Sequence, residues 1–255
     1  MVPFLISVPH GGWDIPSEVE GLLQLSRHDL FDDMDPFTQE IYDFSGLVGH
    51  QLVGKVYRAI VDLNRSPDDL PTTNPDGVVK SVTCHKVQVY KTVEGPSGNI
   101  SKRLVDNYYR PYHKELEVEA RSGRFVLGID CHSMASYPPA IAPDKNEKRP
   151  LFCLGDNYGK ACNPKLTHSL ARIIQEVLQL SEGEVTHNNP FAGGYITQQH
   201  GYNPIPWIQL EMNRCLYLEE PWFDDQTLTL QPGRIQQLNL KLREVLTRLS
   251  NELVW

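Results

Sequence analysis

The sequence predicts an α/β protein with three layers, in which helices cover both faces of a mixed, mostly parallel sheet. Short apolar runs that contain β-branched residues alternate with longer segments whose apolar residues recur every three or four positions, a pattern typical of βα units. The chain has 255 residues, and α/β folds of this length are commonly undivided. We therefore expect one domain that spans residues 1–255.

Composition argues against several classes of protein. The formal net charge of −8 is unlike that of nucleic-acid-binding proteins, which carry a basic face. The five cysteines are odd in number and form no C-x-x-C pair, so we expect neither a disulfide framework nor a zinc knuckle. Signal-peptide and membrane-spanning patterns are absent. We expect a cytoplasmic protein without nucleic-acid or membrane partners, and the sequence leaves its oligomeric state open.

The order of elements follows from the same two periodicities. Strands are expected at residues 3–8, 56–61, 125–129, 151–154 and 206–210. Helices are expected at residues 18–25, 36–52, 101–120, 163–177 and 235–249, with Pro111 bending the third and His113 on its exposed side. Residues 66–82 and 136–150 are predicted loops, and the glycine-hinged segment 188–197 is a candidate lid.

Polar side chains follow four of the predicted strands at the point where each strand ends. They are His10, the pair Asn64 and Arg65, the pair Asp130 and His132, and the pair Glu211 and Arg214. The carboxyl ends of parallel strands share one edge of a sheet, and ligands bind in the crevice at that edge. We therefore expect these side chains to converge on one site.

Two histidines and a carboxylate suit a catalytic zinc ion, which takes three protein ligands and leaves one position open. His10, His132 and one acid of the cluster at residues 33–35 supply such a set. Asp130 would hold the other ring nitrogen of His132, and Glu211 would remain free as a general base. Arg65 and Arg214 would anchor a substrate carboxylate or polarise a carbonyl, so metal-assisted hydrolysis of an amide is the implied chemistry.

Structural explanations compete with these roles. The acidic cluster can cap a helix that begins at Pro36, His10 can lie in a plain glycine turn, and Arg65 can pair with Asp62, Asp68 or Asp69. Rival mechanisms have less support. A G-x-S-x-G elbow is absent, and Cys131 and His132 point in opposite directions on a strand.

Taken together, the polar segments resemble the N-formylglutamate amidohydrolase family. The matching segments are residues 7–12, 33–35, 61–65, 130–134, 193–195 with 200–201, and 209–214. They occur in family order across residues 4–217. The resemblance implies a phosphorylase/hydrolase-like fold related to that of the zinc carboxypeptidases.

The resemblance also implies residue roles. One Zn²⁺ ion would be held by His10, Asp35 and His132, with Glu211 as the base. The candidates for contact with the substrate are Asn64, Arg65, Tyr195, His200 and Arg214, the last also a catalytic candidate. The family's acidic element continues with Trp-His and a further acid, whereas Pro36-Phe37 and Gln39 stand here. Asp33 therefore stays open as an alternative to Asp35.

The implied activity is zinc-dependent cleavage of the amide bond of an N-formyl, or other N-acyl, amino acid such as N-formyl-L-glutamate. The expected partner is a small molecule with a free carboxylate. Two alternatives remain at this point. One is a zinc carboxypeptidase or peptide amidase that uses the same site, and the other is a non-catalytic member that binds a small molecule.

Overall fold

A six-stranded sheet forms the centre of the protein in a computed structural model, which describes residues 1–70, 73–139, 142–144 and 147–253. Its strand order is β2-β1-β3-β6-β4-β5. The bounds are β1 Val2–Val8, β2 Val48–Val53, β3 Leu127–Met134, β4 Phe152–Gly155, β5 Val185–His187 and β6 Trp207–Asn213. Every pairing is parallel except that of β4 with β6. The predicted mixed, mostly parallel sheet is confirmed.

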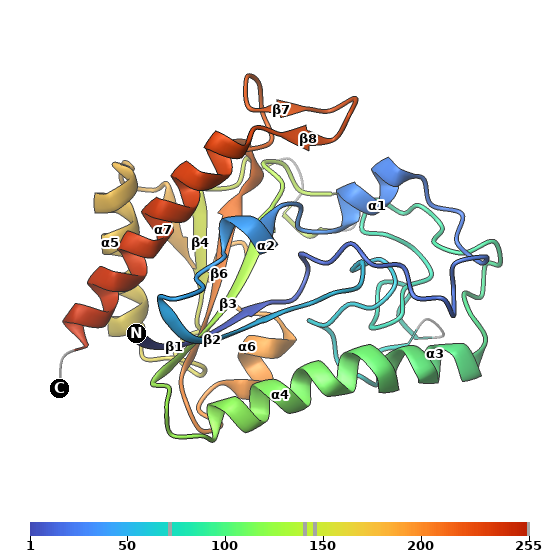
Figure 1. The fold of residues 1–255 in the computed structure, drawn as a ribbon, viewed down its shortest axis with the longest axis horizontal. Coiled ribbons are helices and arrows are strands. Elements are labelled where there is room, and N and C mark those ends of the chain that lie inside the picture. Colours follow the sequence, from blue (N-terminus) through green and yellow to red (C-terminus); the bar gives the residue numbers. More distant parts are fainter. Residues whose placement is uncertain (71–72, 140–141, 145–146, 254–255) are drawn as a thin grey trace.

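Helices cover both faces of this sheet, as Figure 1 shows. One face carries α2 (Thr38–Ile41), α5 (Pro164–Leu178) and α7 (Pro232–Glu252), and the other carries α4 (Arg110–Ala120) and α6 (Tyr195–His200). The remaining elements are α1 Arg27–Asp33, α3 Gly98–Leu104, η1 Val105–Tyr109, η2 Arg214–Leu216, β7 Phe223–Asp224 and β8 Thr229–Leu230. The three-layer α/β/α class is therefore confirmed.

The two faces of the sheet differ in polarity. On β3, Leu127, Ile129 and Cys131 belong to the core beneath α5 and α7. Successive side chains of a strand point to opposite faces, so Asp130 and His132 lie on the α4 and α6 side. The neighbouring strand β6 repeats this alternation. The polar face is where the candidate site lies.

The Trp207 ring of β6 packs against the backbone of β3 because residue 128 is a glycine. A Cβ atom at Gly128 would lie 2.2 Å from the Trp207 ring. The fully buried Trp207 ring can lie against the backbone of β3 only when residue 128 has no side chain.

Two sequence predictions on the first half of the chain are wrong. Residues 56–61 form turns, with one isolated bridge from Val56 to Asp14, and the strand beside β1 is instead β2 (Val48–Val53). Residues 36–52 were expected to be a helix, but only α2 is helical there. Short apolar runs fit a buried strand and a buried turn equally well, so their partners decide the structure.

Smaller differences concern helix ends and strand lengths. Residues 18–22 form turns, Leu23 forms an isolated bridge to Tyr90, and the helix nearby is α1, which begins after a capping box between Ser26 and Asp29. The predicted helix 101–120 continues as α3, η1 and α4, with a π-helical turn just before Pro111. His113 is not exposed, because its Nε2 atom hydrogen-bonds to the carbonyl oxygen of Leu63 at 2.8 Å.

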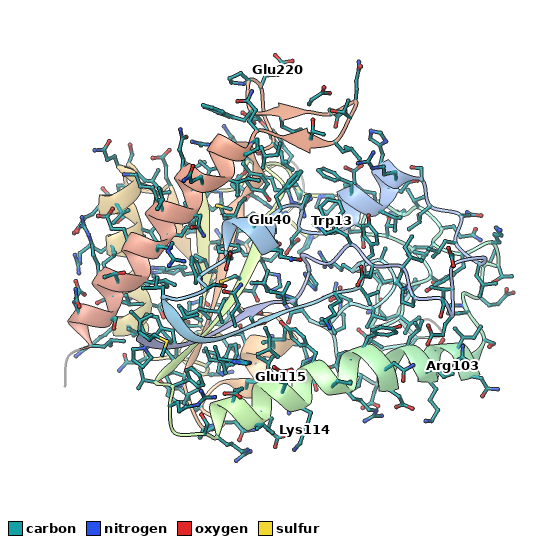
Figure 2. All side chains as sticks on the ribbon, viewed as in Figure 1. Trp13, Glu40, Arg103, Lys114, Glu115 and Glu220 are labelled. Carbon is teal, nitrogen blue, oxygen red and sulfur yellow. The ribbon has the colours of Figure 1, made fainter. Side chains whose placement is uncertain are left out.

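The described parts of the predicted loops 66–82 and 136–150 contain no helix, and residues 71–72, 140–141 and 145–146 lie outside the described residues. Charged side chains such as Arg103, Lys114 and Glu115 project from the outer side of α3 and α4 (Figure 2). Among the described residues, every helix is too short or too polar to cross a lipid bilayer.

Candidate metal and active site

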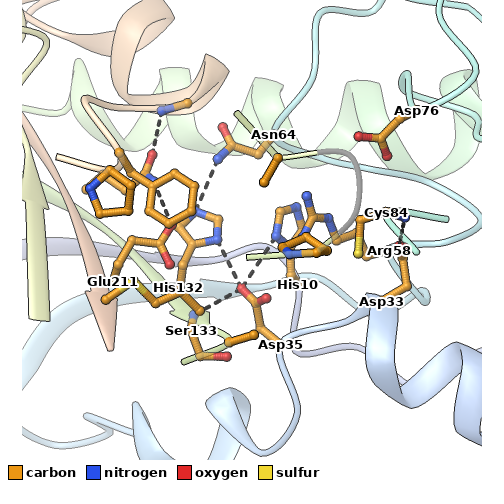
Figure 3. Close-up of a pocket in the computed structure, with 18 of the residues that line it drawn as sticks. His10, Asp33, Asp35, Arg58, Asn64, Asp76, Cys84, His132, Ser133 and Glu211 are labelled. Carbon is orange, nitrogen blue, oxygen red and sulfur yellow. Dashed lines mark hydrogen bonds and ion pairs between the residues drawn. The ribbon is translucent and has the colours of Figure 1, made fainter. Parts of the chain in front are cut away.

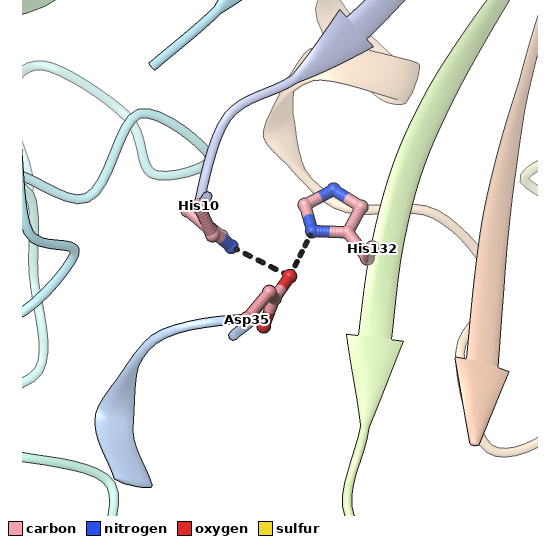
Figure 4. Close-up of side chains that lie close together, drawn as sticks. All are labelled: His10, Asp35 and His132. Atoms are coloured by element: carbon pink, nitrogen blue, oxygen red, sulfur yellow. Dashed lines mark hydrogen bonds and ion pairs between the residues drawn. The ribbon is translucent and has the colours of Figure 1, made fainter. Parts of the chain in front are cut away.

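Three buried side chains meet at one end of the sheet, as Figure 4 shows. His10 follows β1, Asp35 lies between α1 and α2, and His132 lies within β3. Their candidate ligand atoms all lie within 4.8 Å of one another. Asp35 Oδ2 is 3.1 Å from His132 Nδ1 and 3.5 Å from His10 Nδ1. The structure thus brings together the three residues that the sequence proposed as metal ligands.

The backbone holds His10 and Asp35 next to each other. The Asp35 amide donates to the carbonyl oxygen of His10 at 3.1 Å. Beyond His10 the chain passes against residues 54 and 55, where a Cβ atom on Gly12 would lie 2.2 Å from the Lys55 carbonyl carbon. Glycine is required at this close approach, which explains why the histidine precedes two glycines.

Each histidine is held by a second carboxylate at its other ring nitrogen. His10 Nε2 lies 2.8 Å from Asp62 Oδ1, and His132 Nε2 lies 2.9 Å from Asp130 Oδ2. A neutral imidazole has one donor and one acceptor nitrogen. If Nε2 donates to the carboxylate, each Nδ1 turns a lone pair toward the Asp35 oxygen. His10 Nδ1 is buried without a hydrogen-bond partner, so this arrangement calls for a proton or a cation at its centre.

The pKa shifts of the cluster also indicate that it binds a proton or a cation. Burial alone would raise the pKa of Asp35, but the neighbouring rings of His10 and His132 hold it well below its usual range. Burial alone would lower the pKa of His132, but Asp130, Asp35 and Glu211 raise it well above the usual value. Without a metal ion, the negative charge around His132 therefore favours a bound proton.

Asp33 occupies a different position from Asp35. Its Oδ2 accepts from the fully buried Lys80 at 3.0 Å, and its Oδ1 accepts from the Cys84 amide at 2.7 Å. Burial alone would raise the pKa of Asp33, but Lys80 and Arg58 hold it at about 2. Figure 3 shows Asp33 beside Cys84 and apart from the two histidines. The geometry thus favours Asp35 as the candidate carboxylate ligand.

Glu211 lies beside the cluster on β6, paired across the sheet with His132. Gln209, two residues earlier on the same face, donates to Glu211 Oε1 at 2.7 Å and accepts from the Gly194 amide at 2.5 Å. Burial raises the pKa of Glu211, which suits a carboxylate that accepts a proton near neutral pH. Gln209 therefore fixes the orientation of the candidate base.

A cavity of about 570 Å³ opens onto these side chains. His10, Asp35, His132 and Glu211 all line it. Clefts of roughly 300–1,000 Å³ are typical of small-molecule sites. The four residues therefore face a space in which a small molecule can reach them.

The arginines at the cavity differ in how many donors they have left. Arg214 uses four of its five N–H groups on the carbonyl oxygens of Asp32 and Met34, on Ser133 Oγ and on Asp35 Oδ1. Arg65 Nε and Nη2 donate to Asp76, which leaves Nη1 without a partner among the described residues. Arg214 therefore mainly holds Asp35 in place, whereas Arg65 has N–H donors available for a ligand.

The other sequence candidates divide between the cavity and its supports. Asn64 lines the cavity, but its Oδ1 accepts from the Ile196 amide at 2.7 Å and its Nδ2 lies 3.2 Å from His132 Nε2. Tyr195 also lines it. His200 is absent from the lining and lies 3.3 Å from His113 Nδ1 through its Nε2. The structure therefore does not bring His200 to the site.

Sequence reasoning missed several residues of this site. Asp62 was considered only as a partner of Arg65, yet it holds His10. Gln209 and Arg58 were not assigned roles, although both line the cavity. A signal existed for Gln209, because it shares the strand period of two with Glu211. Lys80 left no such signal, since its partners lie at residues 33, 62 and 76.

Comparison with known proteins gives consistent results. A family model described as N-formylglutamate amidohydrolase matches residues 2–218. A curated N-formylglutamate deformylase from Pseudomonas putida is 30% identical over 258 residues, covering 97% of this chain and 92% of that protein. All residues of the candidate metal cluster fall within the matched region.

Two solved structures have a similar fold. A crystal structure of N-formylglutamate amidohydrolase from Ralstonia eutropha JMP134 superposes with a TM-score of 0.78 at 22% identity, covering 98% of this chain and 93% of that one. The gene product Atu2144 from Agrobacterium tumefaciens gives a TM-score of 0.68 at 15% identity, covering 99% and 91%. These matches extend the fold similarity over nearly the whole chain.

Proposed function

The chain belongs to the N-formylglutamate amidohydrolase family, and from that premise we propose that it is a zinc-dependent amidohydrolase. The proposed reaction is hydrolysis of the amide bond of an N-formyl, or other N-acyl, amino acid such as N-formyl-L-glutamate. The relative from Pseudomonas putida carries the name N-formylglutamate deformylase, and this name supports the choice of substrate.

The observation that carries this proposal is the pair of Nδ1 atoms directed at Asp35 Oδ2. His10 and His132 are each held at Nε2 by a carboxylate, and His10 Nδ1 has no hydrogen-bond partner. Two nitrogen donors and one oxygen donor, with second carboxylates behind the histidines, form the donor set typical of a catalytic zinc ion. These residues therefore fit Zn²⁺.

The charges of the site also support a divalent cation. The cluster and its neighbours contain six buried acidic side chains, namely Asp33, Asp35, Asp62, Asp76, Asp130 and Glu211. Four basic side chains accompany them, namely Arg58, Arg65, Lys80 and Arg214. With neutral histidines the acids exceed the bases by two charges. Buried charges need compensation, and one divalent ion would supply it.

In the proposed reaction Zn²⁺, when bound, supplies a Lewis acid that polarises the amide carbonyl and lowers the pKa of water. Glu211 accepts the proton of the attacking water and returns a proton to the leaving nitrogen. Gln209 keeps Glu211 Oε1 in place through its 2.7 Å hydrogen bond. Arg214 holds Asp35 through the 3.1 Å contact between Nη2 and Oδ1.

Arg65 is the best-placed anchor for the substrate carboxylate, because it lines the cavity and its Nη1 group has no hydrogen-bond partner among the described residues. Arg58 lies beside it, since both approach Asp62 Oδ2, at 2.9 Å and 3.9 Å from their Nε atoms. A guanidinium group binds a carboxylate through two parallel hydrogen bonds. Arg65→Lys should therefore raise the KM for N-formyl-L-glutamate more than it lowers kcat.

The variant Glu211→Gln tests the proposed function through the role of Glu211 as the general base. This variant should keep its zinc, while kcat for formate release from N-formyl-L-glutamate falls by about 10²–10⁴-fold, as expected for loss of a general base. Zinc content by elemental analysis and formate release are the two measurements. Turnover at the wild-type rate would show that Glu211 is not the base.

A substrate panel separates this function from its rivals. Formate and a free amino acid are the products expected from an N-formyl amino acid, whereas a carboxypeptidase would release the terminal amino acid of a peptide. Wild-type protein that contains zinc and hydrolyses neither type of substrate would contradict the proposal of an enzyme.

A further inference from the structure

The cavity has two walls of unlike chemistry. The basic wall contains Arg58 and Arg65, which contact Asp62 behind His10. The apolar wall contains Met134, Ala135, Pro139, Ala142, Pro143 and Phe191. Met134 and Ala135 follow His132 along the chain, so the apolar wall continues from the His132 side of the cluster. The candidate metal ligands therefore lie between the two walls.

The basic residue next to the apolar wall, Arg149, does not offer its charge to a ligand. Arg149 is buried and lines the cavity, but its Nε and Nη2 groups donate to Asp144 at 2.8 Å and 3.0 Å. Its guanidinium carbon lies 4.8 Å from the centre of the Phe191 ring. The charge of Arg149 is therefore neutralised by Asp144, and the surface offered to a ligand there is mainly hydrocarbon.

The different chemistry of the two walls suggests how an N-acyl amino acid would be oriented in the cavity. If its carboxylate binds Arg65 and its amide carbonyl lies at the cluster, the acyl group extends away from the basic wall, toward Met134 and Phe191. A formyl group has no carbon chain to cover this surface, and the cavity of about 570 Å³ is in the range of drug-sized ligands. A formyl group would therefore leave the side chains of Met134 and Phe191, which line the cavity, without an apolar partner.

Resting on the proposed function, we propose that this enzyme hydrolyses N-acyl amino acids whose acyl group is a longer, apolar chain. Water cleaves the C–N bond of the amide: the acyl carbon gains the hydroxyl group of water, and the nitrogen leaves with the remaining hydrogen. The products are a fatty carboxylic acid and a free amino acid. The apolar wall binds the acyl chain, and the basic wall binds the amino-acid carboxylate.

The acyl chain length should control the rate. Each methylene group that leaves water for an apolar surface contributes ~0.8 kcal/mol, equivalent to about a fourfold gain in binding. The wild-type enzyme should therefore show kcat/KM values that rise by up to about fourfold per methylene from N-acetyl- through N-butanoyl- to N-hexanoyl-L-glutamate. Release of the amino acid is the measurement for every substrate.

Larger side chains on the apolar wall should remove the dependence of kcat/KM on acyl chain length. Ala135→Leu and Ala142→Leu each place a larger side chain at the acyl chain. Each should lower kcat/KM for the hexanoyl substrate at least about ten times more than for the acetyl substrate. Two variants are used so that a folding defect in one leaves the other informative. Val118→Leu, on the exposed outer side of α4, is the matched control and should leave the ratio of the two rates unchanged.

This set of substrates distinguishes failure of the chain-length inference from failure of the proposed amidohydrolase function. Rising rates with chain length in the wild type, reversed by the leucine variants, would support the inference. Hydrolysis of N-formyl-L-glutamate with negligible hydrolysis of the acetyl, butanoyl and hexanoyl substrates would overturn it and leave the proposed function standing. Zinc-loaded protein that hydrolyses none of the four substrates would overturn both.

Discussion

The two histidines of the candidate site are held in the same way but in different surroundings. Asp62, behind His10, lies among three cations, with Arg58 Nε at 2.9 Å, Lys80 Nζ at 3.7 Å and Arg65 Nε at 3.9 Å. Asp130, behind His132, accepts a hydrogen bond from the hydroxyl of Ser7 at 2.7 Å. Ser7 in turn lies 2.9 Å from the hydroxyl of Tyr112 on α4.

This difference separates a role in folding from a role in metal binding. Burial alone would raise the pKa of Asp62, but Arg58, His10 and Arg65 hold it well below the usual range, so its charge is compensated by its neighbours. Asp130 has neutral partners, so its charge acts mainly on His132 and raises the pKa of that ring. We expect the His10 side to stabilise the fold and the His132 side to control metal affinity.

Asp62→Asn should produce the largest effect. It leaves Arg58 and Lys80 buried without their shared carboxylate, and breaking a buried ion pair in this way typically costs about 3–5 kcal/mol of the free energy of unfolding. Urea unfolding of the zinc-free variant measures this loss. Asp130→Asn in the same assay is the control and should lose clearly less; equal losses would remove the proposed difference between the two sides.

Lys80→Met tests the stabilising role of the His10 side through the pH dependence of stability. Burial alone would lower the pKa of Lys80, but Asp33, Asp76 and Asp62 raise it above its ordinary value. A raised pKa means that the stabilisation by Lys80 is complete below the unfolded pKa of about 10.4 and is lost as pH rises through the folded pKa.

The wild type should therefore be more stable than Lys80→Met at pH 7 by about 3–5 kcal/mol. The gap should narrow only above about pH 10.4. Unfolding free energies between pH 7 and pH 11.5 measure it, and a gap that does not change with pH would contradict the assigned charge of Lys80.

Asp130→Asn should act mainly on the metal. The amide cannot accept the ring N–H with a full negative charge, so zinc affinity should fall by about 10–100-fold, the usual effect of losing a carboxylate behind a histidine ligand. Competition with a chelator of known affinity measures this change. Zinc affinity equal to that of the wild type would contradict the role of Asp130.

Tyr112→Phe should give the smallest effect. It removes only the hydroxyl that contacts Ser7, a loss worth about 1 kcal/mol of the free energy of unfolding. Zinc affinity should change by less than about threefold, with Ser7→Ala intermediate between this variant and Asp130→Asn. A loss of affinity as large as that of Asp130→Asn would show that the hydroxyl chain does more than support the aspartate.

The sequence predicted the fold class and proposed the residues of the candidate metal cluster, with Asp33 as an alternative to Asp35, but it placed the polar residues wrongly along the strands. Asp130, His132 and Glu211 were expected beyond the strand ends, whereas they lie inside β3 and β6. The apolar runs stop at Ile129 and Leu210, so hydrophobicity alone ends the strands too early. These polar residues are tolerated within the sheet because His132 binds Asp130 and lines the cavity, while Glu211 is bound by Gln209 and also lines it.

Other features depend on partners distant in sequence. The strand β2 was read as the end of a helix because Val48 and Leu52 also fit a helical spacing, and only pairing with β1 distinguishes the two. Lys80 and Asp62 meet through loops of irregular structure, for which the sequence contains no periodic signal. The reading of Arg65 as a partner of nearby acids holds in part, since it contacts Asp62 and Asp76.

We propose that a zinc ion binds between His10, Asp35 and His132. Anomalous diffraction at the zinc absorption edge, from crystals of protein supplied with zinc, tests it most directly. We expect a single strong peak within bonding distance of both histidine Nδ1 atoms and an Asp35 oxygen. A peak at Asp33, a peak bonded to Nε2 atoms, or no peak at this cluster would contradict it.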